Sequence, residues 1–340
     1  MDTVALIKGD GIGPEVVEAT LRVLEASGSR LDYREVLAGE QARARVGVEL
    51  PIETIREIRE LGVALKAPLH AARMSGGVSV VENGTVRRHP SVNNGLRREL
   101  GLFVNVRPVK GWAVAMDLVI MREITEDMYA GLERRIDEQT AEAVKRITAG
   151  ATSRLARYAC EYALRMGRRR IMAVHKANVL HLTDGLFLET VRETVAHYPS
   201  LLFEEMAIDA ACYNMVKRPG MFDVLVLPNQ YGDIISDLAA GVAGSLGLAP
   251  GANIGPEAAV FEAAHGAAPD IAGRNVANPI GLILSAAMML DHLGRQDAAR
   301  RVREGVDLLL TRPEHLTPDL GGMAGTRELA GALCAAVQEV

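Results

Sequence analysis

Aromatic residues are scarce in this chain of 340 residues, where Phe, Trp and Tyr together make up only 4%. A hydrophobic core must therefore come mainly from Ala, Val, Leu, Ile and the 13 Met residues. Hydrophobic residues still reach 49% and charged residues 24%, a composition that excludes a wholly disordered chain. At this length we expect two domains.

Cysteines are few, and long apolar runs are missing. Cys160, Cys212 and Cys334 are widely spaced and form no C-x-x-C pair, which excludes a zinc ribbon and a disulfide framework. No apolar run reaches the ~18 to 20 residues of a membrane span. The first residues contain no basic segment typical of a signal peptide. We therefore expect a cytoplasmic protein with reduced thiols.

A surplus of positive charge is also missing, since the formal net charge is −5. The chain has no global field to attract nucleic acid or an anionic membrane, and we expect neither as a partner. If the substrate is an anion, the positive charge that binds it must be local.

Short apolar segments alternate with amphipathic ones along the first half of the chain, which predicts an α/β fold with a largely parallel sheet. A hairpin is expected within 129–145, a mobile loop over the Gly-, Ser-, Asn- and Arg-rich segment 68–90, and mainly helices after Asp233. The predicted strands are 4–7, 31–37, 63–65, 102–108, 117–122, 171–175 and 223–227. The predicted helices are 15–25, 52–61, 152–166 and 184–196.

A glycine-rich turn, Gly9-Asp10-Gly11-Ile12-Gly13-Pro14, follows the first strand. It could be a dinucleotide fingerprint with Glu35 as the ribose acid, but the third glycine falls one position short of G-x-G-x-x-G. A bare G-x-G is also common in ordinary strand-to-helix turns, so the sequence disfavours a Rossmann domain.

Two aspartates four residues apart, Asp233 and Asp237, occupy one face of a predicted helix. Paired carboxylates suit a hard divalent cation, and Asp209 is a third candidate ligand. The alternative is that both residues simply favour a helix N-terminus, as acidic side chains do.

Three arginines form a second group: Arg97, Arg107 and Arg122. Arg107 and Arg122 are predicted at strand ends, where a long cation is unusual unless it points into a cleft. Because guanidinium groups bind carboxylates bidentately, the three predict a pocket for a di- or tricarboxylate. Taken singly, each arginine is better explained as a solvated charge or as one partner of a surface ion pair.

Two further segments carry polar groups. Lys176 lies just beyond a buried strand, where desolvation can lower the pKa of its ammonium group and suit it to proton transfer. The Gly- and Pro-rich segment from His265 to Gly273, followed by Asn278-Pro279, could wrap a nucleotide.

Together these segments resemble the β-decarboxylating dehydrogenases, which include isocitrate, isopropylmalate and homoisocitrate dehydrogenases. The most specific matches are the Asp233/Asp237 motif and His265-Gly266-x-Ala268-Pro269-Asp270. The resemblance implies an isocitrate/isopropylmalate dehydrogenase-like fold: two α/β domains with a non-Rossmann cofactor site in the cleft. It implies a large cofactor-binding domain of residues 1–101 and 242–340. The small domain, 102–241, would form the contact of a homodimer; whether dimers pair into tetramers stays open.

The resemblance also implies roles for individual residues. Tyr129 matches the catalytic tyrosine, and Lys176 matches the catalytic lysine that the second subunit supplies. The substrate-binding matches are Lys66, Ser91, Asn93, Arg97, Arg107 and Arg122. The Mg²⁺ or Mn²⁺ ligands, drawn from both subunits, are Asp209, Asp233 and Asp237. The cofactor-binding matches are Glu262, His265, Gly266, Ala268, Pro269, Asp270, Ile271 and Asn278.

The resemblance implies NAD as cofactor, because the family position of Asp270 faces the adenosine ribose. A carboxylate there binds the ribose hydroxyls and repels a 2′-phosphate, whereas enzymes that prefer NADP carry Lys-Tyr at Asp270-Ile271.

Substrate choice rests on the segment before Arg97. Isopropylmalate enzymes place leucines where this chain has Asn93 and Asn94, and an isopropyl group would leave these amides unpaired at about 1–3 kcal/mol each. Ser91 and Asn93 match residues that hold the distal carboxylate of isocitrate. Isocitrate is therefore the expected substrate. The alternatives are homoisocitrate or another 3-substituted malate, including one bearing a phosphonate, and, less favoured, 3-isopropylmalate or a non-catalytic regulatory subunit.

Overall fold

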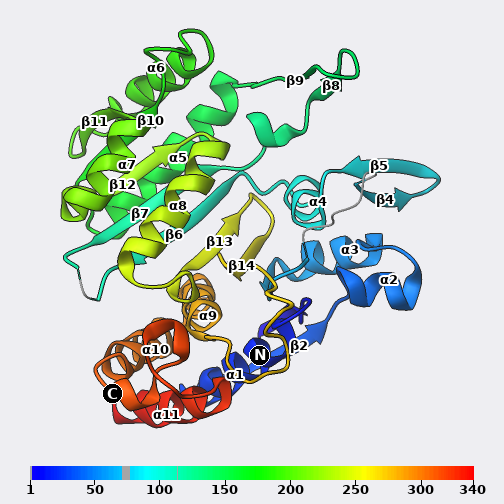
Figure 1. Ribbon diagram of the computed structural model, residues 1–340, viewed down its shortest axis with the longest axis vertical. Helices are drawn as coiled ribbons and strands as arrows, with labels where there is room; N and C mark the ends of the chain where they lie inside the picture. Colours follow the sequence, from blue (N-terminus) through cyan, green and yellow to red (C-terminus); the bar gives the residue numbers. More distant parts are fainter. Residues whose placement is uncertain (1, 71–76, 113) are drawn as a thin grey trace. The chain divides into compact units, whose positions relative to one another are not determined.

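The computed structural model describes residues 2–70, 77–112 and 114–340. The chain divides into two compact units, Met1–Leu102 with Ser245–Val340 (unit 1) and Phe103–Gly244 (unit 2). The resemblance placed these boundaries after residues 101 and 241. Unit 1 is assembled from both ends of the chain, blue to cyan and yellow to red in Figure 1, and unit 2 is the continuous middle.

Unit 1 is built on five strands in the order β13-β14-β3-β1-β2. β3 pairs in parallel with both β1 and β14, and only β13 runs antiparallel, to β14. All four residues of β3 are buried, as expected for a central strand. The strands are β1 (Asp2–Ile7), β2 (Leu31–Glu35), β3 (Val63–Lys66), β13 (Pro250–Ile254) and β14 (Ala259–Ala263).

The helices of unit 1 cover this sheet and one another. α9 packs on β13 and β14, α3 on β1 and β3, and α1, α10 and α11 contact each other at the bottom of Figure 1. The helix predicted over 52–61 is confirmed and ends where Gly62 adopts a left-handed conformation. The helices are α1 (Gly13–Ala26), α2 (Glu40–Val46), α3 (Ile52–Leu61), α4 (Val92–Glu99), α9 (Ile280–His292), α10 (Gln296–Leu309) and α11 (Thr326–Glu339).

The glycine-rich turn between β1 and α1 serves close packing of backbones. Gly11 has a φ of +58°, and a Cβ there would lie 2.0 Å from the carbonyl oxygen of Ala267. Between the glycines, the buried Asp10 carboxylate accepts the backbone N–H groups of Glu40 and His70, each at 3.0 Å. The glycines are therefore explained by this approach of one loop to another, without a dinucleotide.

Unit 2 has a second five-stranded arrangement, in the order β11-β10-β12-β7-β6. Only β6 runs antiparallel to its neighbour β7. Its strands are β6 (Val104–Lys110), β7 (Asp117–Glu123), β10 (Arg170–His175), β11 (Leu202–Ala207) and β12 (Val224–Leu227). Its helices are α5 (Ala149–Arg165), α6 (Thr183–Val195), α7 (Ile208–Lys217) and α8 (Asn229–Ala243).

Helices cover both faces of the unit 2 strands. α7 and α8 pack against alternate strand residues such as Ile120, Val174 and Leu225. α5 contacts β7, β10 and β12, and α6 packs beside α5. The predicted hairpin is confirmed as β8 (Glu133–Arg135) and β9 (Ala141–Ala143), whose residues are all exposed. The α/β class is thus confirmed in both units.

Two sequence predictions were wrong. Within 68–90, residues 71–76 lie outside the described part, but β4 (Val78–Glu82) and β5 (Thr85–His89) form a hairpin instead of a loop. Its turn is Asn83-Gly84, with both φ values positive, a strong hairpin signal that composition concealed. The chain after Asp233 also contains β13 and β14: β13 is rich in Gly, Ala and Pro, which have low strand propensity, and it pairs with β14, which in turn pairs with the distant β3.

Within the described residues, no helix combines the length and apolar character that crossing a membrane requires.

Candidate active site

Two aspartates on α8 both lie near the guanidinium group of Arg107, which belongs to β6. Arg107 Nη2 lies 3.5 Å from Asp233 Oδ1, and its Nη1 lies 3.6 Å from Asp237 Oδ1. Ser236, between the two aspartates, accepts a hydrogen bond from Arg107 Nη1 at 2.5 Å. The predicted common face of Asp233 and Asp237 is therefore confirmed. Arg107 lies in the middle of β6, not at a strand end as predicted, because the strand continues through Pro108 to Lys110.

Both aspartates lie beyond the first turn of α8, which contains no acidic residue. The preference of acidic side chains for a helix N-terminus therefore does not explain them. Burial raises the pKa of Asp237, and the neighbouring charge of Asp233 raises it further, against the opposing effect of Arg107. Two carboxylates are thus held together where a cation would relieve their repulsion.

Arg122 is the most tightly held of the predicted arginines, with its side chain only 2% exposed. Its Nε and Nη2 donate to Asn229 Oδ1 at 3.0 and 2.8 Å, and its Nη1 pairs with Asp233. Gly232 makes this position possible, since a Cβ there would lie 2.7 Å from Arg122 Cγ. The missing side chain of Gly232 therefore gives Arg122 its place against α8.

Tyr129 joins the same cluster from the short 3₁₀ turn Met128–Ala130. Its hydroxyl donates to Asp233 Oδ2 at 3.1 Å, and the Arg122 guanidinium lies 5.4 Å from the ring centroid. Burial and the Asp233 carboxylate raise the pKa of Tyr129, so the phenol stays protonated at neutral pH. It can therefore donate a proton or a hydrogen bond.

Lys176 and Asp209 form a separate pair, with Lys176 Nζ 2.6 Å from Asp209 Oδ1. The hydrogen bond from Lys176 lowers the pKa of Asp209, which is therefore ionised at neutral pH. In residues 2–70, 77–112 and 114–340 no three His, Cys, Asp or Glu side chains gather as a metal site. A single chain thus presents its catalytic candidates as two groups, one around Asp233 and one around Asp209.

The donor set fits a divalent cation all the same. Carboxylate oxygens are the ligands that Mg²⁺ and Mn²⁺ prefer. Around α8 the two positive charges of Arg107 and Arg122 are balanced by Asp233 and Asp237. The cluster by itself therefore offers little net positive charge to a substrate with several carboxylates.

A buried ion triad in unit 1 holds two predicted substrate cations. Glu262 Oε2 lies 2.5 Å from Lys66 Nζ, its Oε1 lies 3.7 Å from Arg97, and Asn253 donates to Oε1 at 2.6 Å. Burial would raise the pKa of Glu262, but Lys66 and Arg97 outweigh it and lower the pKa to about 2. Glu262, predicted in the cofactor wall, therefore holds the substrate-side cations in place.

The predicted cofactor-binding segment begins with His265, whose ring can form a hydrogen bond to a ligand. Burial lowers the pKa of His265, so its imidazole is neutral. His265 Nδ1 lies 3.1 Å from the Gly266 carbonyl oxygen, and its buried Nε2 has no hydrogen-bond partner among the described residues. Asn278 is anchored by Asp319 at 3.0 Å. These groups fit a polar cofactor, and the remaining predicted contacts, Ala268, Pro269, Asp270 and Ile271, follow in the turn after Gly266.

The segment predicted to select the substrate, which precedes Arg97, lies at the start of α4. Ser91 caps this helix, its Oγ accepting the Asn94 N–H at 3.2 Å, so its own hydroxyl proton remains able to donate. The Asn93 side-chain oxygen is buried and finds no hydrogen-bond partner in the described part of the chain. These two side chains therefore offer polar groups to a ligand.

Sequence reasoning missed the residues that hold these groups. Asn229, Ser236 and Asn105 fix the two arginines, and Asp127, Lys145 and Asp184 form a buried ion network nearby. Ser236 lies inside the Asp233/Asp237 motif, but none of the others belongs to a recognisable motif by itself. The available signals were Asn229, two residues after a buried strand, and Asp184, at the start of a predicted helix.

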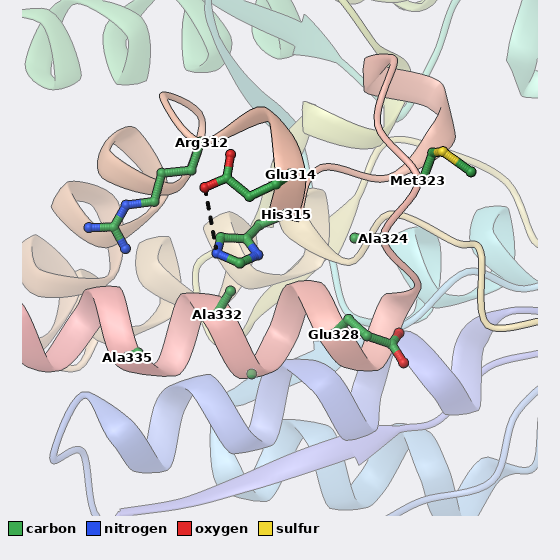
Figure 2. Close-up of a pocket in the computed structure, with 9 residues that line it drawn as sticks. Arg312, Glu314, His315, Met323, Ala324, Glu328, Ala332 and Ala335 are labelled. Atoms are coloured by element: carbon green, nitrogen blue, oxygen red, sulfur yellow. Dashed lines mark ion pairs between the residues drawn. The ribbon is translucent and has the colours of Figure 1, made fainter.

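A pocket of about 610 Å³ lies elsewhere in unit 1, beside α11. Figure 2 shows Arg312, Glu314 and His315 above the helix, with Ala332 and Ala335 along it. It includes none of the predicted site residues.

The family model for isocitrate/isopropylmalate dehydrogenases matches residues 3–333. This chain belongs to that family. It is 45% identical to the isocitrate/homoisocitrate dehydrogenase of Thermus thermophilus, covering 99% of each chain. It is 42% identical to catalytic subunit 5 of the mitochondrial NAD isocitrate dehydrogenase of Arabidopsis thaliana, over 98% of this chain and 87% of that one.

Other relatives carry different names. Identity is 43% to the 3-isopropylmalate dehydrogenase of Archaeoglobus fulgidus, with 97% of this chain and 98% of that one covered. The crystal structure of isocitrate dehydrogenase from Methylococcus capsulatus superposes with a TM-score of 0.91 at 42% identity, covering 99% of this chain and 100% of that one. The family member described here is an NAD-dependent decarboxylating dehydrogenase.

Gly232→Ala is expected to displace Arg122 and to lower kcat/KM about tenfold or more, because a Cβ at this position overlaps the Arg122 side chain. Gly241→Ala on the same helix is the matched control, since a Cβ there meets nothing within 4 Å. The control should keep its activity and gain roughly 0.5–1 kcal/mol of stability. If kcat/KM were the same in the two variants, Gly232 would not be needed to place Arg122.

Glu262→Gln is expected to lower the free energy of unfolding at pH 7 by roughly 3–5 kcal/mol, because it leaves Lys66 buried without its anion. The pKa of Glu262 falls from 4.5 to about 2 on folding, so its contribution is complete above pH 4.5 and is lost as the pH falls through 2.

Urea unfolding of both proteins from pH 7 down to pH 2 measures this difference, which should shrink below pH 4.5. The exposed Glu257→Gln in the same unit is the control and should change stability by no more than ~0.5 kcal/mol. A difference that stays constant with pH would show that Glu262 contributes no ionic stabilisation.

Proposed function

We propose that this dehydrogenase oxidises and decarboxylates isocitrate, giving 2-oxoglutarate and CO₂ with NAD and a divalent cation, Mg²⁺ or Mn²⁺. The observation that carries the choice of substrate is the polar start of α4. Ser91 keeps a hydroxyl proton to donate, and the side-chain amide of Asn93, two residues along, carries N–H donors. An apolar substituent would leave such groups unsatisfied, whereas a carboxylate accepts hydrogen bonds from a hydroxyl and an amide N–H.

The cations supply the remaining recognition of a tricarboxylate. Arg107 and Arg122 in unit 2, and Lys66 and Arg97 in unit 1, are held by buried partners and so lose little conformational entropy when they bind an anion. Asp209, Asp233 and Asp237 would hold the divalent cation. That ion, when bound, acts as a Lewis acid toward the substrate hydroxyl and the oxygen that becomes negative on decarboxylation.

Two side chains are assigned to proton movement. Lys176 assists removal of the substrate hydroxyl proton at its Nζ, which Asp209 orients. Tyr129, whose phenol stays protonated beside Asp233, delivers the proton that the product carbon takes up. His265, Asn278 and Asp270 are assigned to NAD, with the Asp270 carboxylate next to the ribose hydroxyls.

The working form is proposed to be a homodimer with shared sites, in which Lys176 and the ligand Asp209 of one chain serve the Asp233 group of its partner. This accounts for the division of the catalytic candidates into two groups within one chain. A cytoplasmic location is part of the same proposal and agrees with the free cysteines.

Homoisocitrate is the second candidate substrate. It presents a carboxylate on an arm longer by one methylene, and the relative from Thermus thermophilus is named for both acids. The Ser91 hydroxyl and the amide N–H groups of Asn93 at the start of α4 suit either acid.

A substrate panel tests the choice. With NAD and Mn²⁺, kcat/KM for NADH formation should be highest with isocitrate, then homoisocitrate, and about 10- to 100-fold lower with 3-isopropylmalate, because one lost buried hydrogen bond costs about 1–3 kcal/mol. Asn93→Leu should narrow the gap to isopropylmalate by about tenfold or more. Preference for isopropylmalate by the unaltered enzyme would overturn the proposal.

Mixing two inactive variants tests the shared sites. Tyr129→Phe and Lys176→Met chains, each inactive alone, are expected to regain up to one quarter of full activity when unfolded and refolded together. Half of the dimers are then mixed, and one of their two sites has both residues intact. If the mixture stays as inactive as either variant alone, each chain uses its own Lys176 and Tyr129.

A further inference from the structure

A buried lysine in unit 2 connects the segments that carry both proton-transfer candidates. Lys145 follows β9, and its side chain is 11% exposed. Its Nζ lies 2.6 Å from Asp184 Oδ1, 3.7 Å from Asp127 Oδ1 and 4.2 Å from the centroid of the Tyr231 ring. Asp127 and Asp184 are both completely buried, so Lys145 is their shared counter-ion.

Asp184 links Lys145 to the backbone of Lys176. While Oδ1 binds Lys145, its other oxygen, Oδ2, accepts the backbone N–H of Lys176 at 2.7 Å. Asp184 stands in the first turn of α6, so it joins the end of β10 to that helix. The backbone of Lys176 is therefore held by the Asp184 carboxylate, and Lys145 balances the negative charge of that carboxylate.

Asp127 links Lys145 to the turn that carries Tyr129. It adopts a φ of +70° and begins the 3₁₀ turn that carries Tyr129. Its Oδ2 accepts the Gln230 N–H at 2.8 Å, and its own N–H donates to the Arg146 carbonyl oxygen at 2.9 Å. The turn is thus held both to the start of α8 and to the residue after Lys145.

We propose that Lys145 is a positioning residue that sets Lys176 and Tyr129 together, through Asp184 and Asp127, without touching the substrate itself. This inference rests on the proposed roles of Lys176 and Tyr129. Burial would lower the pKa of Lys145, but Asp184 and Asp127 outweigh it and raise it, so the ammonium keeps its charge. A neutral side chain would leave two buried carboxylates facing each other without a cation.

The chain contains a matched arrangement away from the catalytic candidates. Asp223 Oδ2 accepts the backbone N–H groups of Arg169 and Arg170 at 2.9 Å each, and Arg168 Nη1 lies 3.2 Å from its Oδ1. As with Asp184, one oxygen holds backbone and the other a cation. Arg168→Met therefore removes a counter-ion of similar construction without touching Lys176 or Tyr129.

The test compares Lys145→Met, Lys145→Arg and Arg168→Met in the whole enzyme. Lys145→Met should lower kcat at least 30-fold while KM for isocitrate and NAD changes less than threefold, and Lys145→Arg should recover most of kcat. Arg168→Met should lower the thermal midpoint and leave kcat within twofold. Hydrogen exchange of the peptides containing Lys176 and Tyr129 should accelerate in Lys145→Met alone.

Other outcomes separate the possible failures. If Lys145→Met lowers only the thermal midpoint, as Arg168→Met does, the positioning role is overturned. If Lys145→Met does not fold, Asp184→Asn replaces it, since its amide oxygen can still accept the Lys176 N–H, and an unchanged kcat there overturns the role. Tyr129→Phe and Lys176→Met are measured in parallel: if both keep full kcat, the proposed catalytic roles fail, and the positioning role that rests on them is overturned too.

Discussion

A guanidinium can be buried only where acceptors surround it, and unit 2 is organised around that requirement at Arg122. Asn229 at the first position of α8 and Asp233 one turn later supply the acceptors, and Gly232 between them leaves the space. The start of α8, the end of β7 and the Tyr129 ring are therefore fixed by one side chain. Changing Asp233 would leave the buried charge without its anion, and changing Asn229 would leave two of its N–H groups without this acceptor.

The same rule extends to unit 1 and to the Lys145 network. Lys66 is buried against Glu262, and Lys145 against Asp127 and Asp184. Each of these pairs places a charge at a defined point on rigid elements, at the cost of removing it from water. Such sites gain little stability from the ion pair itself, but they hold the charged side chains in one defined arrangement.

Sequence patterns predicted what depends on local order. The helix of residues 52–61 has an apolar face and a terminating glycine, and both signals lie within a few positions. The common face of Asp233 and Asp237 follows from helical periodicity alone. β13 escaped prediction because Gly, Ala and Pro carry little strand preference, and β14 is a short strand that pairs with β3, far away in the sequence.

The residues that hold the candidate site residues in place were not predicted, for a related reason. Asn229 contacts Arg122 across more than a hundred residues of chain, and nothing near either residue indicates the other. Lys145 has the appearance of a surface lysine beside an exposed hairpin, and only the fold shows that two carboxylates surround it. The candidate site residues lie in recognisable sequence motifs, whereas the residues that hold them in place are defined by three-dimensional contacts.

The discontinuous construction of unit 1 has a consequence for the synthesis of the chain. β3 needs β14 on one side, and all of unit 2 lies between them in the sequence. On the ribosome, the middle unit can therefore complete its own strand pairing before the N-terminal segment has its last partner. Until then, β3 exposes an apolar edge that is prone to aggregation and is a natural binding site for a chaperone.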